Sequence, residues 1–364
     1  MSLNVDILDG NRTFTPGDTV QGIVKVNAEH PVKAKSLRVF LKASAQTEWL
    51  VSVYGIDSVH GRSAKVLYTA SVVYGHEEHS LWAPEEHEKK GTIPQGMHAY
   101  PFEFVLPTDC PPSFEGTCGS ISCTITAEIE RPWKTNKTSS VTLSVCPVFD
   151  LNLIAEAALA ASALKFKKTG CMLFRHGKIC IQMKLQRSGF VVGETLEAVA
   201  EINNNSKQPV VKLDLRLRRV DSYTAYRHRR ASNNDMKRSN KRQEETTVAE
   251  NTEHINIAPN EVETATVSLE IPETIPTFRT CSIIEVTYYV EVRAVCKGAI
   301  NNSVACRHPV VIGTLPLTAK TADDEDRTAS QSPKFCPSIP QLCRDTNIAA
   351  TLPMSTHGQD ARGS

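Results

Sequence analysis

Apolar and polar residues alternate with a period of two along two stretches of this chain, which match each other without a gap. The first runs from Phe14 to Asn27 and the second from Phe190 to Asn203. A phenylalanine, a glycine, an acidic residue, a threonine and an asparagine recur at the same places in both. The pattern predicts a turn at the glycine, then a strand with one apolar face. These faces comprise Val20, Val24 and Val26 in the first copy and Leu196, Ala200 and Ile202 in the second.

The same register continues past a polar loop into a further alternating strand in each copy. Its apolar positions are Leu37, Val39 and Leu41 in the first copy and Leu213, Leu215 and Leu217 in the second. A repeat at this spacing is too long for a solenoid, so it predicts two similar domains in tandem. Short alternating strands separated by turn residues, with little helix, are typical of antiparallel sandwiches. We therefore predict an all-β chain with two antiparallel sandwiches in tandem.

Two regions depart from this alternation and set the predicted boundaries. Residues 148–177 include an Ala-rich piece that favours a helix by propensity or serves as an extended crossing between domains. Beyond Leu315 the chain contains the acidic residues Asp323–Asp326, several prolines and many Ser and Thr residues, which predicts a disordered tail. The expected organisation is a first sandwich at 1–147, a linker at 148–177, a second sandwich at 178–314 and a tail at 315–364.

Length, charge and cysteine usage fit a two-domain cytosolic protein. The chain has 364 residues and a net charge of +1, which does not favour nucleic-acid binding by the chain as a whole. Its 11 cysteines include no C-x-x-C pair, and the N-terminus shows no secretory pattern, so we expect reduced thiols. No apolar run is long enough to span a bilayer.

Several short motifs, in this order and spacing, resemble the arrestin-domain-containing (α-arrestin) family over roughly residues 1–316. They lie at 106–107, 111–116, 119–121, 127–134, 148–152, 187–194 and 309–314; two of them read Pro-Pro-Ser-Phe-Glu-Gly (111–116) and Pro-Val-Val-Ile-Gly-Thr (309–314). The resemblance implies two arrestin-type, immunoglobulin-like antiparallel β-sandwiches joined by a short linker. It also implies a cytosolic adaptor, peripheral to the plasma membrane or endosomes, that engages transmembrane cargo such as receptors or transporters in trafficking, endocytosis or ubiquitin-dependent sorting.

Family members commonly carry P-P-x-Y motifs that bind WW domains of HECT-type ubiquitin ligases. No tyrosine follows Tyr289 here, so a link to such a ligase is expected to be indirect, and a tail peptide from Thr318 to Ser364 should not bind isolated WW domains. The segment Pro111–Phe114 resembles this ligand superficially. Because Pro276–Phe278 repeats it in the second half, we interpret both segments as structural corners.

The most unusual stretch is the basic segment, Lys212–Arg242. It is interpreted either as a strand with a solvated face followed by a polar loop, or as a contact for anionic lipid or a phosphorylated cargo tail, since arginine suits phosphate. Ser232 follows two arginines and is a candidate phosphosite that would reduce the local positive charge. The candidate contact residues, all assigned to the predicted loop, are Arg227, Arg229, Arg230, Lys237, Arg238, Lys241 and Arg242.

Two further features have structural interpretations. His76, His79 and His87 lie among glutamates, but their spacing on a strand or loop favours a charged surface over a metal site. Trp133 is expected to anchor the end of a strand with its ring buried; a contact with cargo is the alternative.

The sequence shows no nucleophile–base constellation, no phosphate-binding glycine loop and no metal signature. We therefore expect a non-enzymatic adaptor without catalytic residues, cofactor or metal. The alternative is a stable subunit of an endosomal sorting complex of the retromer type, whose sorting subunits share the arrestin fold.

Overall fold

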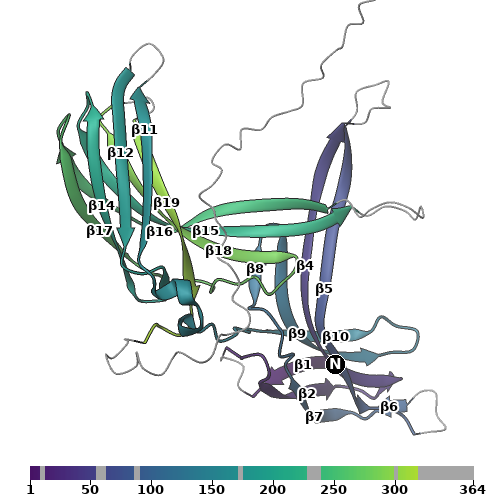
Figure 1. Cartoon of the computed structure of the whole chain (residues 1–364). Coiled ribbons are helices and arrows are strands. Elements are labelled where there is room, and N and C mark those ends of the chain that lie inside the picture. The colour runs from purple at the N-terminus through teal and green to yellow at the C-terminus, as the bar shows by residue number, and fades with distance from the viewer. Residues whose placement is uncertain are drawn as a thin grey trace, which may run out of the picture.

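The structure is a computed structural model that describes residues 1–8, 13–54, 63–85, 91–170, 175–227, 239–298 and 302–318. These residues form strands β1–β19 and two short 3-10 helices (Figure 1). The first half contains β1 (Ser2–Ile7), β2 (Thr19–Ala28), β3 (Val32–Ala34), β4 (Ser36–Tyr54), β5 (Ser63–Trp82), β6 (Gly91–Ile93), β7 (Gly96–Val105), β8 (Phe114–Gly116), β9 (Gly119–Glu130) and β10 (Lys137–Leu143).

The second half begins with the two helices and continues as strands. Its elements are η1 (Leu151–Leu153), η2 (Ala155–Ala158), β11 (Ala161–Gly170), β12 (Arg175–Leu185), β13 (Gly189–Val191), β14 (Thr195–Ser206), β15 (Val210–Arg227), β16 (Ser239–Ile257), β17 (Val262–Glu270), β18 (Ile284–Cys296) and β19 (Ser303–Gly313). No helix in the described part of the chain has the length and apolar character needed to cross a membrane.

Each half is an antiparallel sandwich, as the alternation predicts. In the first, the sheet β1-β2-β7 faces the strands β10-β9-β4-β5; in the second, the sheet β11-β12-β14-β17 faces β16-β15-β18-β19. The predicted apolar faces are buried, with each of the following side chains at most 1% exposed: Val20, Val24, Val26, Leu196, Ala200 and Ile202. Burial of these faces drives both sandwiches to form.

The repeated glycine occupies the same backbone conformation in both sandwiches. Gly17 has φ +89° and Gly193 has φ +84°, in the left-handed region that glycine adopts without strain. The acidic residue that follows closes each turn by accepting a backbone N–H. Asp18 Oδ2 accepts from Thr15 N at 2.9 Å, and Glu194 Oε2 accepts from Val191 N at 2.9 Å. The predicted equivalence of the two turns is confirmed.

The proline-containing segments form a second pair of equivalent corners. In the first sandwich, Ser113 N donates to Val145 O at 2.8 Å, and Val145 N donates to Ser113 Oγ at 3.0 Å. In the second, Thr277 N donates to Ile312 O at 2.8 Å, and Ile312 N donates to Thr277 Oγ1 at 2.9 Å. Each hydroxyl residue thus joins its corner to a passing strand, as the structural interpretation predicted.

The two sandwiches are not separate sheets side by side, because one ten-stranded sheet runs through both. Its path, β10-β9-β4-β5-β15-β18-β19-β13, crosses the domain boundary where Tyr226 and Arg227 of β15 pair with Thr69 and Tyr68 of β5. Figure 1 shows β15 and β16 running from the C-terminal sandwich to β5. The sequence did not predict this junction. It arises because the β15–β16 hairpin is longer than the sandwich that it belongs to.

The region assigned to a linker is partly built into the second sandwich. Residues 151–158 form η1 and η2, whereas residues 161–170 form β11, which pairs with β12 along its length. β11 is therefore an edge strand of the C-terminal sandwich. The predicted disordered tail, apart from residues 315–318, lies outside the described residues.

Candidate functional site

The basic segment lies on the β15–β16 hairpin, with its two halves in different surroundings. Its first part occupies β15, which extends to Arg227, and β16 begins at Ser239. The assignment of Arg227, Lys241 and Arg242 to a loop is therefore wrong. β16 is an edge strand with polar side chains on both faces, so its sequence lacks the alternation that would reveal a strand. The other candidate positions, Arg229, Arg230, Ser232, Lys237 and Arg238, lie outside the described residues.

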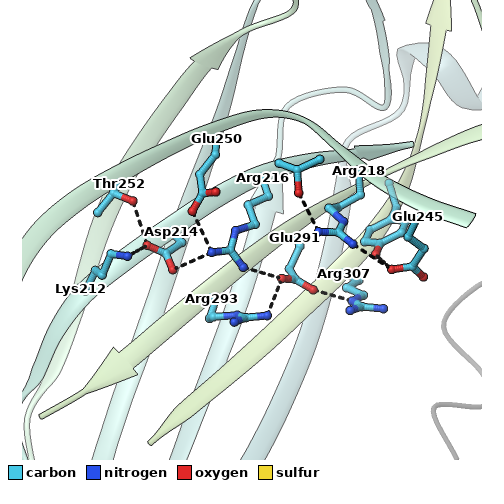
Figure 2. A network of polar contacts seen from close by, with 12 residues as sticks. Lys212, Asp214, Arg216, Arg218, Glu245, Glu250, Thr252, Glu291, Arg293 and Arg307 are labelled. Atoms are coloured by element: carbon cyan, nitrogen blue, oxygen red, sulfur yellow. Dashed lines mark hydrogen bonds and ion pairs between the residues drawn. The ribbon is translucent and has the colours of Figure 1, made fainter. Parts of the chain in front are cut away.

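Strand alternation places the leucines of β15 in the core and its charged residues Lys212, Asp214, Arg216 and Arg218 on the opposite, outer face. There Asp214 is only 2% exposed, so its carboxylate needs partners. Lys212 Nζ lies 2.8 Å from Oδ1, Arg216 Nη2 lies 3.5 Å from Oδ2, and Thr252 donates its hydroxyl to Oδ1 at 2.9 Å (Figure 2). The carboxylate is thus satisfied by neighbours on β15 and β16.

A second buried carboxylate, Glu291 of β18, gathers three arginines around it (Figure 2). Its oxygens lie 3.6 Å from Arg216 Nη1, 3.1 Å from Arg293 Nη2 and 2.7 Å from Arg307 Nε. Arg216 also lies 2.8 Å from Glu250, and this hydrogen bond is the main cause of the raised pKa of its guanidinium. Arg216 therefore joins both buried carboxylates into one network.

The remaining arginines of β15 are also paired. Arg218 lies 3.2 Å from Glu245 and donates to Thr247 Oγ1 at 2.7 Å, while Arg219 Nε lies 2.9 Å from Asp221. Burial raises the pKa of Asp221, and the charge and hydrogen bond of Arg219 offset this only in part. Lys212, Arg216, Arg218 and Arg219 thus neutralise acids of the same sandwich, and this half of the basic segment has a structural role.

The second part of the basic segment belongs to an extension that we call the arm, Asp221–Arg227 of β15 and Ser239–Glu244 of β16. The arm contacts the N-terminal sandwich through polar contacts. Thr47 Oγ1 donates to Thr224 O at 2.8 Å, and Trp49 Nε1 donates to Asn240 Oδ1 at 3.1 Å. Arg242 donates to Leu50 O at 3.0 Å, and its guanidinium lies 5.4 Å from the centre of the Trp49 ring. Arg242 is therefore a docking residue between the sandwiches.

A shared core lies beneath the arm. Phe114 and Phe278 come from the two equivalent proline corners, and their rings meet edge to face with centroids 6.1 Å apart. Tyr223 of β15 packs on Phe114, also at 6.1 Å. Gly116 leaves room for this contact, since a Cβ there would lie 2.1 Å from the Tyr223 hydroxyl. Phe114 is 3% exposed, so the segment that resembles a WW ligand is part of the core.

The histidines His76 and His79 and the residue Trp133 all belong to the N-terminal sandwich. His76 and His79 lie on β5, and His87 lies outside the described residues. His79 Nε2 lies 2.8 Å from Glu77, and its ring stacks on Phe104. No group of three potential metal ligands occurs in the part of the chain that the structure describes. The prediction that Trp133 buries its ring is wrong: it is 94% exposed, in a turn with φ +61°.

Sequence reasoning missed the contact between the two corners and the pairing of β15 with β5. The duplicated Pro-x-Phe segments signalled two similar corners, but no periodicity shows that two corners meet. It also missed the long cross-strand network, because acids and bases far apart in sequence become neighbours only in the paired sheet.

Comparisons with known proteins agree with this architecture. The family model for the N-terminal domain of arrestin (or S-antigen) matches residues 3–152, and the model for the C-terminal domain matches residues 175–317. Arrestin domain-containing protein 4 of Homo sapiens is 28% identical over 307 residues, covering 83% of this chain and 68% of the relative. Arrestin domain-containing protein 1 of Homo sapiens is 29% identical over 226 residues, covering 61% of this chain and 48% of that protein.

A relative with lower sequence identity matches over the same length of this chain. Arrestin domain-containing protein 17 of Caenorhabditis elegans is 23% identical over 307 residues, covering 84% of this chain and 68% of the relative. Both arrestin domains are thus present, in order, in a chain whose two sandwiches share one sheet. The chain therefore belongs to the arrestin-domain-containing family.

Proposed function

We propose that this protein is a non-enzymatic cytosolic adaptor that binds the cytosolic parts of transmembrane cargo, such as receptors or transporters, and directs their trafficking, endocytosis or ubiquitin-dependent sorting. The observation that carries the proposal is the presence of both arrestin domains over most of the chain. Any ubiquitin ligase of the HECT type is reached indirectly, through a partner that carries the WW ligand, because the tail has no P-P-x-Y.

The way the sandwiches are joined supports a scaffold. A shared sheet, a shared core and the arm contacts at Thr47, Trp49 and Leu50 fix one domain against the other. A rigid body of this kind presents loops and strand edges at fixed separations, which suits recognition of an extended cargo segment.

Two buried thiols have a structural role in the N-terminal core. Burial raises the pKa of Cys110 to about 11 and that of Cys123 to about 12, with smaller contributions from Asp109 and Cys110, respectively. Both thiols are therefore protonated at neutral pH and are poor nucleophiles. Their role is to fill the N-terminal core.

Proximity labelling in cells tests the adaptor proposal. The full chain, fused to a labelling enzyme, should label transmembrane proteins and their sorting machinery in a cargo-dependent way, at the plasma membrane or endosomes. The variant Gly116→Val, which disrupts the shared core, is the matched control. It should no longer label these transmembrane proteins and their sorting machinery. Copurification with one fixed set of soluble subunits in constant stoichiometry would contradict the adaptor and support a sorting-complex subunit.

We further propose that the arm, together with residues 228–238 between its two strands in the sequence, supplies a contact for an anionic leaflet. Arg227 and Lys241 lie on the two strands of the arm. Arg229, Arg230, Lys237 and Arg238 lie between them in the sequence. Each basic group near an anionic surface contributes about 1 kcal/mol, which salt screens. Phosphorylation of Ser232 would weaken the contact.

Sedimentation with phosphatidylserine or phosphoinositide vesicles tests this contact. Binding should weaken as salt rises, and Arg229→Glu/Arg230→Glu/Arg238→Glu should abolish it, with Ser232→Glu weakening it modestly. Arg242 is left unchanged because it docks the arm. Reversal of three exposed lysines elsewhere, Lys33, Lys42 and Lys207, is the matched control. Equal sedimentation of the parent and the arm variant would show that the arm is only solvated, and salt-sensitive binding to a phosphorylated cargo peptide alone would assign it to cargo.

A further inference from the structure

A second basic surface, outside the segment discussed above, lies on β11 and β12. From Ala161 to Leu185 the sequence contains no Asp or Glu. Its cationic residues are Lys165, Lys167, Lys168, Arg175, Lys178 and Lys184. Whereas β15 carries acids beside its arginines, β11 and β12 concentrate charge of one sign at the edge of the C-terminal sandwich.

Apolar side chains accompany these lysines. Leu164 and Phe166 are each 61% exposed on the outer face of β11, where alternation places them together. Lys178 Nζ lies 4.1 Å from the centre of the Phe166 ring, so a cation from β12 covers part of the ring. Lys184 lies 3.6 Å from Glu201 of β14. The surface therefore suits a ligand that is acidic and has some apolar character.

The last described residues bring the tail to this surface. Thr318 N donates to Asn152 Oδ1 at 2.8 Å, and Leu317 packs with Leu151 and Ala157 of the two short helices. These helices directly precede β11, and Figure 1 shows them below its first residues. The chain thus leaves the folded body at the foot of β11.

The sequence that follows supplies complementary charge within reach. Asp323, Asp324, Glu325 and Asp326, which we call the acidic run, begin five residues after Thr318. Eight extended residues span about 26–29 Å, and the seven steps from Ala161 to Lys168 span about 23 Å of strand. The acidic run can therefore lie along β11 without strain on the connection.

We infer that the acidic run of the tail docks on the basic face of β11 and β12 of the same chain. Lys168 and Lys178 share the outer face with Leu164 and Phe166 and attract the carboxylates, whereas Lys165 and Lys167 alternate to the other side of this edge strand. The short tether gives the run a high effective concentration at the outer face. Docking covers Leu164 and Phe166 and makes the tail a competitor of any other anionic ligand for this face. The inference is independent of the proposed cargo and lipid contacts.

A water-soluble carbodiimide tests the docking in the full chain, because it joins a lysine amine to a carboxylate only when the two are in contact. Peptide mapping should find amide bonds between the acidic run and Lys168 or Lys178, with a lower yield at Lys165 and Lys167 on the other side of the edge strand. At about 1 M salt, where the Debye length is about 3 Å, their yield should fall several-fold. The variant Asp323→Asn/Asp324→Asn/Glu325→Gln/Asp326→Asn should lose them. Exposed lysines of the N-terminal sandwich, Lys33 and Lys42, serve as internal controls and should not react with the run.

Three results would overturn the inference. Bonds from the acidic run to Lys33, Lys42 or Lys241 at equal yield would show that the run has no preferred face. Bonds that join light and heavy chains in an isotopically mixed sample would assign the face to a second copy. Absence of bonds, together with protection of the same lysines from acetylation only by anionic vesicles, would assign the face to lipid.

Discussion

The strands β4 and β15 occupy the same place in the two sandwiches, yet one equivalent position on their outer faces carries charge of opposite sign. The 176-residue offset that relates Phe14 to Phe190 also relates Arg38 to Asp214. Arg38 faces Glu128 on the neighbouring strand β9, whereas Asp214 faces Arg293 on β18. The inward side is unchanged: the three apolar positions of each strand are at most 1% exposed.

The two sandwiches also differ in how many ion pairs are linked on the outer face and in how deeply the carboxylates are buried. Arg38 makes an isolated cluster with Glu78 and Glu128, at 3.0 and 2.7 Å, and all three side chains are at least 19% exposed. In the C-terminal sandwich the carboxylates of Asp214 and Glu291 are nearly fully buried. The repeat therefore fixes the core register, while the outer face needs only that each buried charge has a partner.

The shared core should give the largest effect, because it belongs to both sandwiches. Phe114→Ala and Phe278→Ala each remove a buried ring from one of two equivalent corners, and each should lower the free energy of unfolding by about 3–5 kcal/mol. The double variant should show a coupling of about 0.5–1.5 kcal/mol, because the rings touch each other. Urea denaturation of the four proteins measures this. Strict additivity would show that the corners do not meet.

The two outer faces can be compared directly by neutralising one carboxylate in each. Glu291→Gln leaves three arginines without their shared partner, and we expect a loss of about 2–3 kcal/mol, less than for a fully buried pair because Arg293 and Arg307 are partly solvated. The matched control Glu128→Gln should lose about 1 kcal/mol or less. Urea midpoints of the two variants give the comparison, and equal losses would remove the distinction between the faces.

Loss of the arm contacts should lower the free energy of unfolding by a smaller amount. Arg242→Ala removes the contact with Leu50 O and the stacking over Trp49, which predicts a loss of about 0.5–1 kcal/mol. The adjacent Lys241→Ala should change stability by less than about 0.5 kcal/mol. Hydrogen exchange at Asn240 should rise only in the first variant. Identical exchange in both would show that Arg242 does not hold the arm.

The smallest effect is a pH dependence confined to the C-terminal sandwich. Burial lowers the pKa of His308, so this ring resists protonation in the folded state, while the unfolded chain takes up a proton below about pH 6.5. Its stability contribution is therefore present above that pH and is lost as pH falls through the lowered folded pKa. His308→Gln should show a smaller fall in melting temperature between pH 7.5 and 5.5 than the parent. An equal fall in both would assign the acid sensitivity to other groups.

Much of the fold followed from alternation alone, since the buried faces of β2 and β14 and the glycine turns at Gly17 and Gly193 were visible in the sequence. The candidate site was harder to predict. Arg216 looked like a surface cation because its partners Glu250 and Glu291 are distant in sequence and meet it only across paired strands. Lys241 and Arg242 looked like loop residues because an edge strand with two polar faces has no apolar period.

Trp133 marks a different limit. Large aromatic side chains usually bury most of their surface, so the sequence favoured an anchored ring. The turn after β9 instead holds its backbone at φ +61° and directs the ring outward. Arg131 fixes this turn by donating from Nε to Thr135 O at 2.9 Å, a local contact that no periodicity encodes.

The two sandwiches form one body, joined by the arm and the shared core. Cysteine labelling during a urea titration, read for each cysteine by mass spectrometry, tests it most directly. Cys123 lies in the N-terminal core and Cys296 in the C-terminal core, and burial raises the pKa of both, that of Cys123 to about 12. If the sandwiches unfold together, both thiols become reactive at the same urea concentration. Exposure of one at a clearly lower concentration than the other would contradict the claim.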